Sequence, residues 1–223
     1  LYYNTKPENR RVIICAFYDS RKRRNLMRQT DGRPLFGAAY YPEYLSWDRV
    51  DQDLDRMKQA GMNVVRIAES TWSTLEPEDG VFDFRYIDRV LDAAGERGIS
   101  VIIGTPTYAV PPWLAKKVPD VMVLTKEGRA GYGPRQKMDI AHPAFRFYAE
   151  RVIRKLLEHT VQRKEVIGFQ IDNETKHYGT ASEAVQDALR EYLKETFQTT
   201  EAFNQAFGLA YWSNSIASFM GEK

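Results

Sequence analysis

Cysteine and histidine are scarce in this sequence of 223 residues, which holds one cysteine and three histidines. The single cysteine, Cys15, excludes an internal disulfide and any zinc site built from several cysteines. The histidines lie far apart, and none has the i, i+4 spacing of helical metal ligands: His142, His159 and His177. We therefore predict no metal and no cofactor, and the low cysteine content fits a reducing, cytoplasmic compartment.

Long hydrophobic runs are also missing. A membrane span needs about 20 apolar residues, and the compact apolar run near the start, residues 12–18, is much shorter. Basic residues flank this run on both sides, and no small-residue cleavage site follows it. We predict neither a signal peptide nor a membrane span.

The charge is nearly balanced over the whole chain, with a net value of +2, so no polyanionic partner is expected. Residues 1–33 are an exception, because they hold nine Lys or Arg and three Asp or Glu. The block at 21–24 (RKRR) could contact nucleic acid, but no aromatic interleaving or binding motif accompanies it. We interpret residues 1–34 as a solvated basic extension and residues 35–223 as one folded domain, with no nucleic-acid partner.

Apolar runs and helical spacings alternate from residue 35 onward. Buried strands are predicted over residues 35–41, 63–68, 100–104 and 166–171. Helices follow them, with apolar stripes within residues 50–60, 87–94, 149–157 and 184–193, and a short helix is expected near 201–207. Ser46 suits an N-cap, Gly61 and Gly98 suit helix ends, and Pro143 suits a first turn. Residues 105–142 are predicted to be a long irregular loop.

This α/β alternation implies a parallel sheet with right-handed crossovers. Two architectures are compatible with it, the doubly wound sheet and the (β/α)8 barrel. A doubly wound nucleotide binder would need a Gly-rich turn after an early strand, and the sequence has none. Four βα units would instead form half of a barrel.

Each predicted strand ends in polar or aromatic residues, and in a barrel these ends converge on the active site. They are Tyr40, Tyr41 and Glu43, then Glu69 and Trp72, then Thr105, Thr107 and Tyr108, then Asp172, Asn173 and Glu174. Carboxylates beside aromatics and amides suit glycoside cleavage, which uses one carboxylic acid and one carboxylate. Aromatic faces and directed hydrogen bonds suit sugar rings and hydroxyls.

Five segments in order then resemble the N-terminal part of glycoside hydrolase family 42 β-galactosidases. They are residues 36–43 (FGAAYYPE), 65–69 (VRIAE), 75–77 (LEP), 104–107 (GTPT) and 168–174 (GFQIDNE), and residues 210–213 (AYWS) fit too. The resemblance covers roughly residues 35–216. It implies the N-terminal part, about four βα units, of a (β/α)8 TIM barrel that hydrolyses terminal β-D-galactosides with retention of configuration.

The resemblance also implies the roles of three residues. Glu174, after Asn173 at the end of the fourth strand, would be the general acid/base. Asn173 would bind the sugar 2-hydroxyl, and Arg135 would be the substrate-binding arginine. Family members are often trimers, so a homo-oligomer is an expectation of the same kind.

The sequence departs from the family in three places. Some members hold a structural zinc with cysteines, but Asp139 stands near the first such position and residues 175–180 contain none, so no zinc site is predicted. Residues 1–33 have no recognised counterpart. The nucleophilic glutamate of the seventh strand is expected outside this chain, which leaves a catalytically inactive half-barrel or sugar-binding remnant as the alternative function.

Other interpretations are less favoured. Glu69 is interpreted as structural, pairing with Arg66 or Arg135, and Glu43 is interpreted similarly. Trp113 fits packing and sugar contact equally well. An aldolase or a metal hydrolase is disfavoured, because no lysine ends a predicted strand and no His/Asp cluster appears.

Overall fold

The computed structural model describes residues 32–174 and 179–220. Most of the predicted basic extension, together with Cys15 and His177, therefore lies outside the described residues. The division of the chain at residue 34 stays a prediction.

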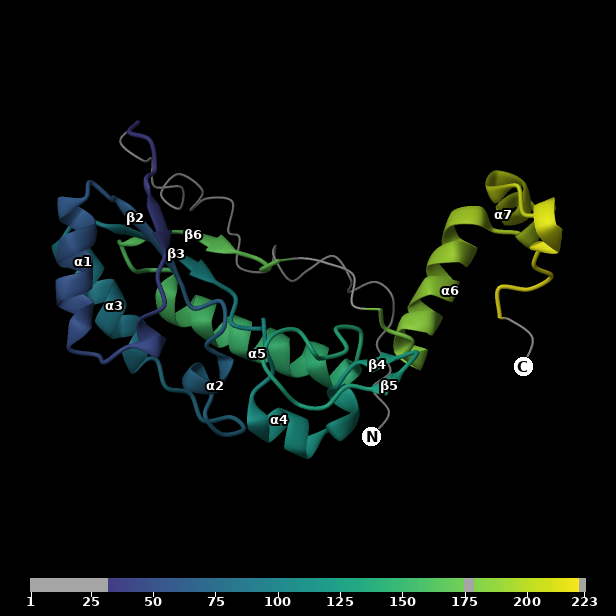
Figure 1. Cartoon of the computed structure of the whole chain (residues 1–223), viewed down its shortest axis with the longest axis horizontal. Helices are drawn as coiled ribbons and strands as arrows, with labels where there is room; N and C mark the ends of the chain where they lie inside the picture. Colours follow the sequence, from purple (N-terminus) through teal and green to yellow (C-terminus); the bar gives the residue numbers. More distant parts are fainter. Residues whose placement is uncertain (1–31, 175–178, 221–223) are drawn as a thin grey trace.

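A parallel sheet forms the centre of the fold (Figure 1). Its strands are β1 (Gly37–Ala39), β2 (Val64–Ile67), β3 (Ser100–Gly104) and β6 (Val166–Gln170), and they lie in the order β1-β2-β3-β6. Every pair is parallel, with register partners such as Ala38 and Val65, and Ile103 and Phe169. Each strand thus pairs with the next one along this sheet, without the reversal of strand order that defines a doubly wound sheet. The predicted partial (β/α)8 barrel is confirmed.

Three long helices pack against this sheet and form the core with it (Figure 1). They are α1 (Arg49–Gln59), α3 (Arg85–Glu96) and α5 (Pro143–Thr160). Their apolar stripes are buried as the spacing predicts, with Leu54, Ile87 and Leu91 completely inaccessible to solvent. Gly61 and Gly98 follow α1 and α3 with φ angles of 83° and 62°, the left-handed conformation that ends a helix. Burial of these stripes against the strands fixes the strand ends on which the site is built.

Two local predictions are wrong. Helix α1 has Asp48 rather than Ser46 at its N-cap, and the Ser46 hydroxyl donates to the Asp48 carboxylate instead. Residues 105–142 are not irregular throughout, because they contain helix α4 (Pro112–Lys117), the 3-10 helix η4 (Pro119–Val121) and a hairpin of β4 (Leu124–Thr125) and β5 (Gly128–Arg129). Proline at the first turn begins α4, and Gly128 takes a left-handed φ of 117° in the hairpin. Two further short helices, η3 (Pro42–Tyr44) and α2 (Trp72–Leu75), follow β1 and β2.

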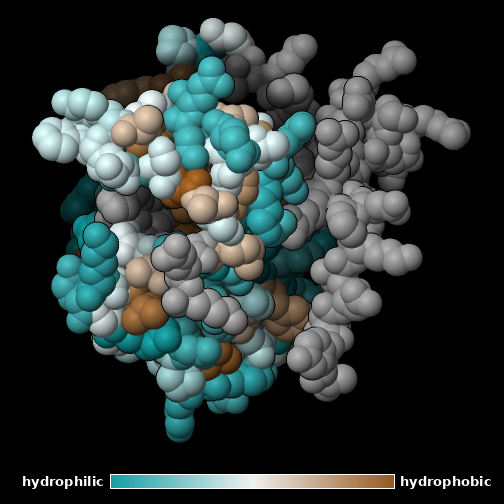
Figure 2. All heavy atoms as spheres, turned by 90° about the vertical axis from the view of Figure 1, so that its right-hand side faces the viewer, coloured by the Kyte–Doolittle hydropathy of each residue, from teal (hydrophilic) through white to brown (hydrophobic). Residues whose placement is uncertain are grey.

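The C-terminal helices lie at the far end of the molecule from the sheet (Figure 1). They are α6 (Glu183–Phe197), α7 (Thr200–Phe207) and the 3-10 helix η5 (Tyr211–Ser213). Ser182 and Thr199 cap α6 and α7 by accepting hydrogen bonds from backbone N–H groups. The stripe that was predicted to face inward on α6 is not buried by the described part of the chain: Leu189 and Tyr192 are 47% and 61% exposed. Figure 2, which faces this end, shows apolar side chains among polar ones.

Candidate active site

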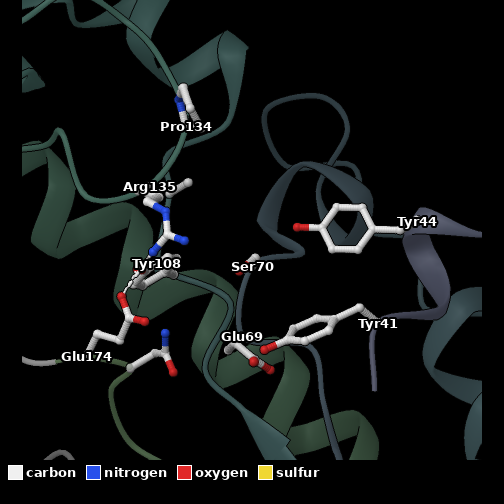
Figure 3. Close-up of a pocket in the computed structure, with 10 residues that line it drawn as sticks. Tyr41, Tyr44, Glu69, Ser70, Tyr108, Pro134, Arg135 and Glu174 are labelled. Atoms are coloured by element: carbon white, nitrogen blue, oxygen red, sulfur yellow. Dashed lines mark hydrogen bonds and ion pairs between the residues drawn. The ribbon is translucent and has the colours of Figure 1, made fainter. Parts of the chain in front are cut away.

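A cavity of about 440 Å³ opens at the carboxyl ends of the strands (Figure 3). Its lining comes from the segments that follow β1, β2, β3 and β6, together with the segment before α5. The lining residues are Tyr41, Tyr44, Glu69, Ser70, Tyr108, Ala109, Pro134, Arg135, Asn173 and Glu174. Active sites of (β/α)8 barrels lie at this end, because the loops after the strands meet there.

The three residues predicted to form the site all line this cavity. Arg135 and Glu174 form an ion pair on one wall of it, with 3.1 Å between Arg135 Nη1 and Glu174 Oε2. Tyr108 completes the group, because its hydroxyl donates to Glu174 Oε2 and accepts a hydrogen bond of 2.8 Å from Arg135 Nη1. A carboxyl group, a guanidinium and a phenol therefore meet at one point of the cavity wall.

Asn173 is held from two sides. Gln170 Nε2 donates to its side-chain Oδ1 over 3.1 Å, and Gln136 Nε2 donates to its backbone carbonyl over 3.1 Å. The first contact orients the amide so that its nitrogen, a pair of donors, is directed away from Gln170. A fixed amide of this kind suits recognition of a hydroxyl group.

The opposite wall of the cavity centres on Glu69, which is 2% exposed. Arg66 Nη2 donates to Glu69 Oε1 over 2.8 Å, so the predicted pairing with Arg66 is confirmed, whereas Arg135 pairs with Glu174. Tyr41 points toward Glu69 in Figure 3, and hydrogen bonding to this carboxylate raises the pKa of Tyr41 above its usual value. The buried charge of Glu69 is thus balanced by a guanidinium, as a buried carboxylate requires.

Gly104 allows β3 to pass close to Glu69. A Cβ atom at position 104 would lie 3.0 Å from Glu69 Cα and 2.7 Å from Glu69 Cβ, and the second distance is shorter than non-bonded carbon atoms adopt. The glycine of the GTPT segment is therefore required by close packing. The close approach of β3 at Gly104 fixes the position of Glu69 in the cavity wall.

Three residues other than glycine adopt a left-handed backbone beside the cavity. Ala68, which precedes Glu69, has φ 82°, Arg135 has φ 63° and Glu174 has φ 47°. Such conformations cost about 1–3 kcal/mol each and persist where the surroundings over-determine them, often at functional sites. Here they direct the Arg135 and Glu174 side chains into the same cavity.

The LEP segment supports the site from outside the cavity. Glu76 is completely buried and accepts from Trp72 Nε1 at 3.0 Å, from the Gly80 backbone at 2.9 Å and from Arg151 Nη2. Trp113 donates to the Glu76 carbonyl over 2.8 Å and packs edge-on against Tyr148. Trp72 and Trp113 are therefore packing residues in this structure, not lining residues of the cavity.

Glu43 also takes a structural position. Tyr86 Oη donates to Glu43 Oε2 over 2.8 Å, and burial raises the pKa of the Glu43 carboxyl above its usual value. Burial, with the nearby Glu43 charge, likewise raises the pKa of the Tyr86 phenol. The pair links the turn after β1 to helix α3.

Neither histidine that the structure describes belongs to the cavity. His142 caps α5 by accepting from the Ala144 backbone at 3.2 Å, and His159 lies 2.8 Å from Asp88. Within residues 32–174 and 179–220, no cluster of three or more His, Cys, Asp or Glu side chains could hold a metal ion. Over the same residues, no helix is long and apolar enough to cross a membrane.

Tyr44, Ser70 and Pro134 also line the cavity, although the sequence did not single them out. Ser70 follows Glu69 directly, and Pro134 precedes Arg135, so both are neighbours of predicted residues. Tyr44 belongs to η3, which the sequence pattern did not predict. Its position shortly after β1 is the feature of the sequence that could have predicted a place in the cavity.

Comparison with known proteins agrees with this geometry. Residues 39–221 match the glycoside hydrolase family 42 model, described as β-galactosidase. The chain is 36% identical to the β-galactosidase BgaA of Thermus sp over 83% of its length and 29% of that protein, and 35% identical to a β-galactosidase of Thermus thermophilus with the same coverage. The structure of a cold-adapted β-galactosidase from Rahnella sp. R3 matches with a TM-score of 0.81 and 30% identity, over 89% of this chain and 30% of that one.

The match therefore extends over most of this chain, which spans about 29% of the length of these curated relatives. It includes all four strands of the sheet except the first two residues of β1. Together with the strand order and the cavity at the strand ends, it shows that the chain belongs to the glycoside hydrolase family 42 β-galactosidases.

Proposed function

We propose that this chain carries the general acid/base half of a retaining β-galactosidase that hydrolyses terminal β-D-galactosides. One observation carries the proposal: Glu174 follows Asn173 at the end of the fourth strand of the sheet, and its carboxyl group lines the cavity beside Arg135. Family membership supports the substrate class, and the cavity supports a ligand of sugar size.

In this mechanism Glu174 is first protonated and donates its proton to the glycosidic oxygen. A second glutamate, from a strand beyond the four described here, attacks the anomeric carbon and forms a covalent glycosyl-enzyme. Glu174 then takes a proton from water, which hydrolyses the intermediate. Retention of configuration needs the two carboxyl groups about 5–5.5 Å apart, so the second one must enter the same cavity.

Arg135 and Asn173 are the proposed sugar-binding groups. The amide of Asn173, oriented by Gln170, would bind the 2-hydroxyl next to the reacting carbon. Arg135 carries five fixed N–H donors, of which the Nη1 group contacts Tyr108 and Glu174. The guanidinium can therefore serve a sugar oxygen and the acid/base carboxyl together.

The second candidate function is a sugar-binding half-barrel without turnover. Its support is the sheet formed by residues 32–174, in which β1 and β6 are the outer strands and Gly37–Ala39 is exposed along its length. Unpaired strand edges favour association with further strands or with other copies. The homo-oligomer suggested by the family resemblance and the cytoplasmic location suggested by the low cysteine content stay predictions.

Two measurements separate the two functions. The turnover of a nitrophenyl β-galactoside by purified residues 1–223 is assayed, and their binding of galactose is measured by calorimetry. We expect no turnover by this chain alone and hydrolysis when the same residues form part of a complete barrel. Turnover by residues 1–223 would contradict the placement of the nucleophile outside the chain, and an inactive complete barrel would favour the binding function.

A further inference from the structure

Tyr108 lies at the centre of the Arg135–Glu174 contact (Figure 3). Its hydroxyl contacts Glu174 Oε2 and lies 2.8 Å from Arg135 Nη1, which itself lies 3.1 Å from the same carboxylate oxygen. The guanidinium carbon of Arg135 also lies 5.9 Å from the centre of the Tyr108 ring, within the range of a cation–π contact. The three groups form a closed triangle.

The chemistry of the three groups fixes the direction of each hydrogen bond. A guanidinium only donates, so the Tyr108 oxygen must accept from Arg135. The single phenolic hydrogen is then left for Glu174 Oε2, which accepts from both partners. While the carboxyl group is ionised, the hydrogen bonds can therefore run in one direction only: Arg135 donates to Tyr108, and Tyr108 donates to Glu174.

Burial makes Tyr108 the fixed member of the triangle. The residue is 8% exposed, whereas the side chains of Arg135 and Glu174 are 67% and 56% exposed. Burial, and then the hydrogen bond to Glu174, raise the pKa of the Tyr108 phenol above its usual value, which favours the protonated hydroxyl that donates to Glu174. A buried phenol therefore presents a donor to Glu174 and an acceptor to Arg135, two groups that are largely exposed.

We infer that Tyr108 is a positioning residue for Glu174, which fixes the direction of its carboxyl group and stabilises its anionic form. This inference rests on the acid/base function proposed above and adds a residue to it. Glu174 gives its proton to the glycosidic oxygen and becomes a carboxylate, while Tyr108 keeps its own proton. The hydrogen bond from Tyr108 strengthens as this negative charge develops, so it favours the transition state over the ground state.

The first test measures the ionisation of Glu174 in residues 1–223, without any need for activity. Glutamate labelled with ¹³C at the side-chain carboxyl is titrated by NMR, and the Glu174 signal is assigned by its loss in Glu174→Gln. In Tyr108→Phe the midpoint should rise by about 0.5–1 pH unit, because a partly exposed carboxylate has lost one donor. Phenylalanine keeps the ring and therefore its packing.

The matched control is Tyr44→Phe, which removes a hydroxyl from the same cavity at a side chain that is 75% exposed. The Glu174 midpoint should stay unchanged in this variant. An unchanged midpoint in Tyr108→Phe, or an equal shift in both variants, would overturn the inference.

A reciprocal titration covers the case in which Tyr108→Phe fails to fold. The ionisation of Tyr108, labelled with ¹³C at Cζ, is compared in the wild-type chain and in Glu174→Gln. Removal of the carboxylate should lower the pKa of Tyr108, because its hydrogen bond to Glu174 raises that pKa. No change would contradict the contact.

The second test uses a complete barrel that carries this chain and separates positioning from general stability. In Tyr108→Phe, kcat/KM should fall about 10-fold for galactosides with poor leaving groups and much less for activated ones. The alkaline limb of the pH profile should also move to higher pH. Equal losses on all substrates with an unmoved profile would overturn the positioning role. A wild-type barrel that hydrolyses no galactoside would instead overturn the proposed function, whatever the titrations show.

Discussion

Arg135 Nη1 and Glu174 Oε2 lie 3.1 Å apart, although 39 positions separate these residues in the chain. Each adopts a left-handed backbone conformation, and each comes from a segment at the carboxyl ends of the strands. The contact joins the residue proposed as acid/base to the residue proposed to bind the sugar. It makes the protonation of Glu174 and the position of Arg135 depend on each other.

Replacement of Arg135 tests this dependence. In a complete barrel, Arg135→Gln should lower kcat/KM for nitrophenyl β-galactoside by about 10- to 100-fold, because hydrogen bonds from a charged donor contribute about 1.5–3 kcal/mol. Arg135→Lys should recover only part of the loss, since a lysine lacks the fork of donors. The neighbouring Arg129, which donates to backbone carbonyls of Asp120 and Met122, provides the control. Equal losses in Arg129→Gln and Arg135→Gln would contradict the assignment.

The buried Glu76 network should contribute strongly to stability. Glu76→Ala leaves Trp72 Nε1 and the Gly80 N–H without their acceptor and leaves Arg151 with its ion pair to Asp79, so the free energy of unfolding should fall by about 3–5 kcal/mol. Urea unfolding of residues 1–223, followed by circular dichroism, measures the change. Glu150→Ala is the control, because its ion pair with Arg154 is solvent-exposed and should contribute less than about 0.5 kcal/mol. Similar losses in the two variants would be evidence against a supporting network.

Gly104 should not tolerate a side chain. A methyl group there meets the Cβ and backbone of Glu69, so Gly104→Ala should destabilise the chain by about 1–3 kcal/mol and displace the Glu69 wall. The comparison is Gly131→Ala, where no heavy atom lies within 4 Å of the added Cβ. The midpoints of urea unfolding measure both variants. A stable Gly104→Ala chain would show that β3 and Glu69 can separate without cost.

The raised pKa of Glu43 should make the stability of the folded chain depend on pH. Burial raises its pKa in the folded chain above the ordinary value of 4.5, so folding favours the protonated form. Its contribution to stability is therefore present below pH 4.5 and is lost as the pH rises through the folded-state pKa. Glu43→Gln removes this titration and keeps an acceptor for Tyr86 Oη. The free energy of unfolding of the variant relative to wild type should increase from pH 4.5 upward, and a constant difference would contradict the prediction.

The fold could be predicted because its signals are local. Apolar runs predicted the four parallel strands, and Gly61 and Gly98 predicted two helix ends that the left-handed φ angles confirm. The predicted inward stripe of α6 failed for a physical reason. Helical periodicity indicates an apolar face but not its partner, and Leu189 and Tyr192 stay 47% and 61% exposed among the described residues.

The site could be predicted only in part. Asn173 and Glu174 follow a predicted strand, but their roles, like that of Arg135, were implied by the family resemblance. The pairing of Arg135 with Glu174, rather than with Glu69, depends on the path of residues 105–142, which no periodicity specifies. Tyr108 and Trp113 both belong to this segment, yet Tyr108 reaches the cavity and Trp113 packs outside it.

The most direct test of the proposed role of Glu174 compares substrates that differ in their need for protonation. In a complete barrel, Glu174→Gln is assayed with a dinitrophenyl β-galactoside, whose leaving group needs no proton, and with an alkyl β-galactoside, whose leaving group does. We predict that hydrolysis of the alkyl galactoside is abolished, whereas formation of the glycosyl-enzyme from the dinitrophenyl galactoside, measured as a burst, is largely retained. Equal losses on the two substrates would contradict the role of Glu174 as the general acid.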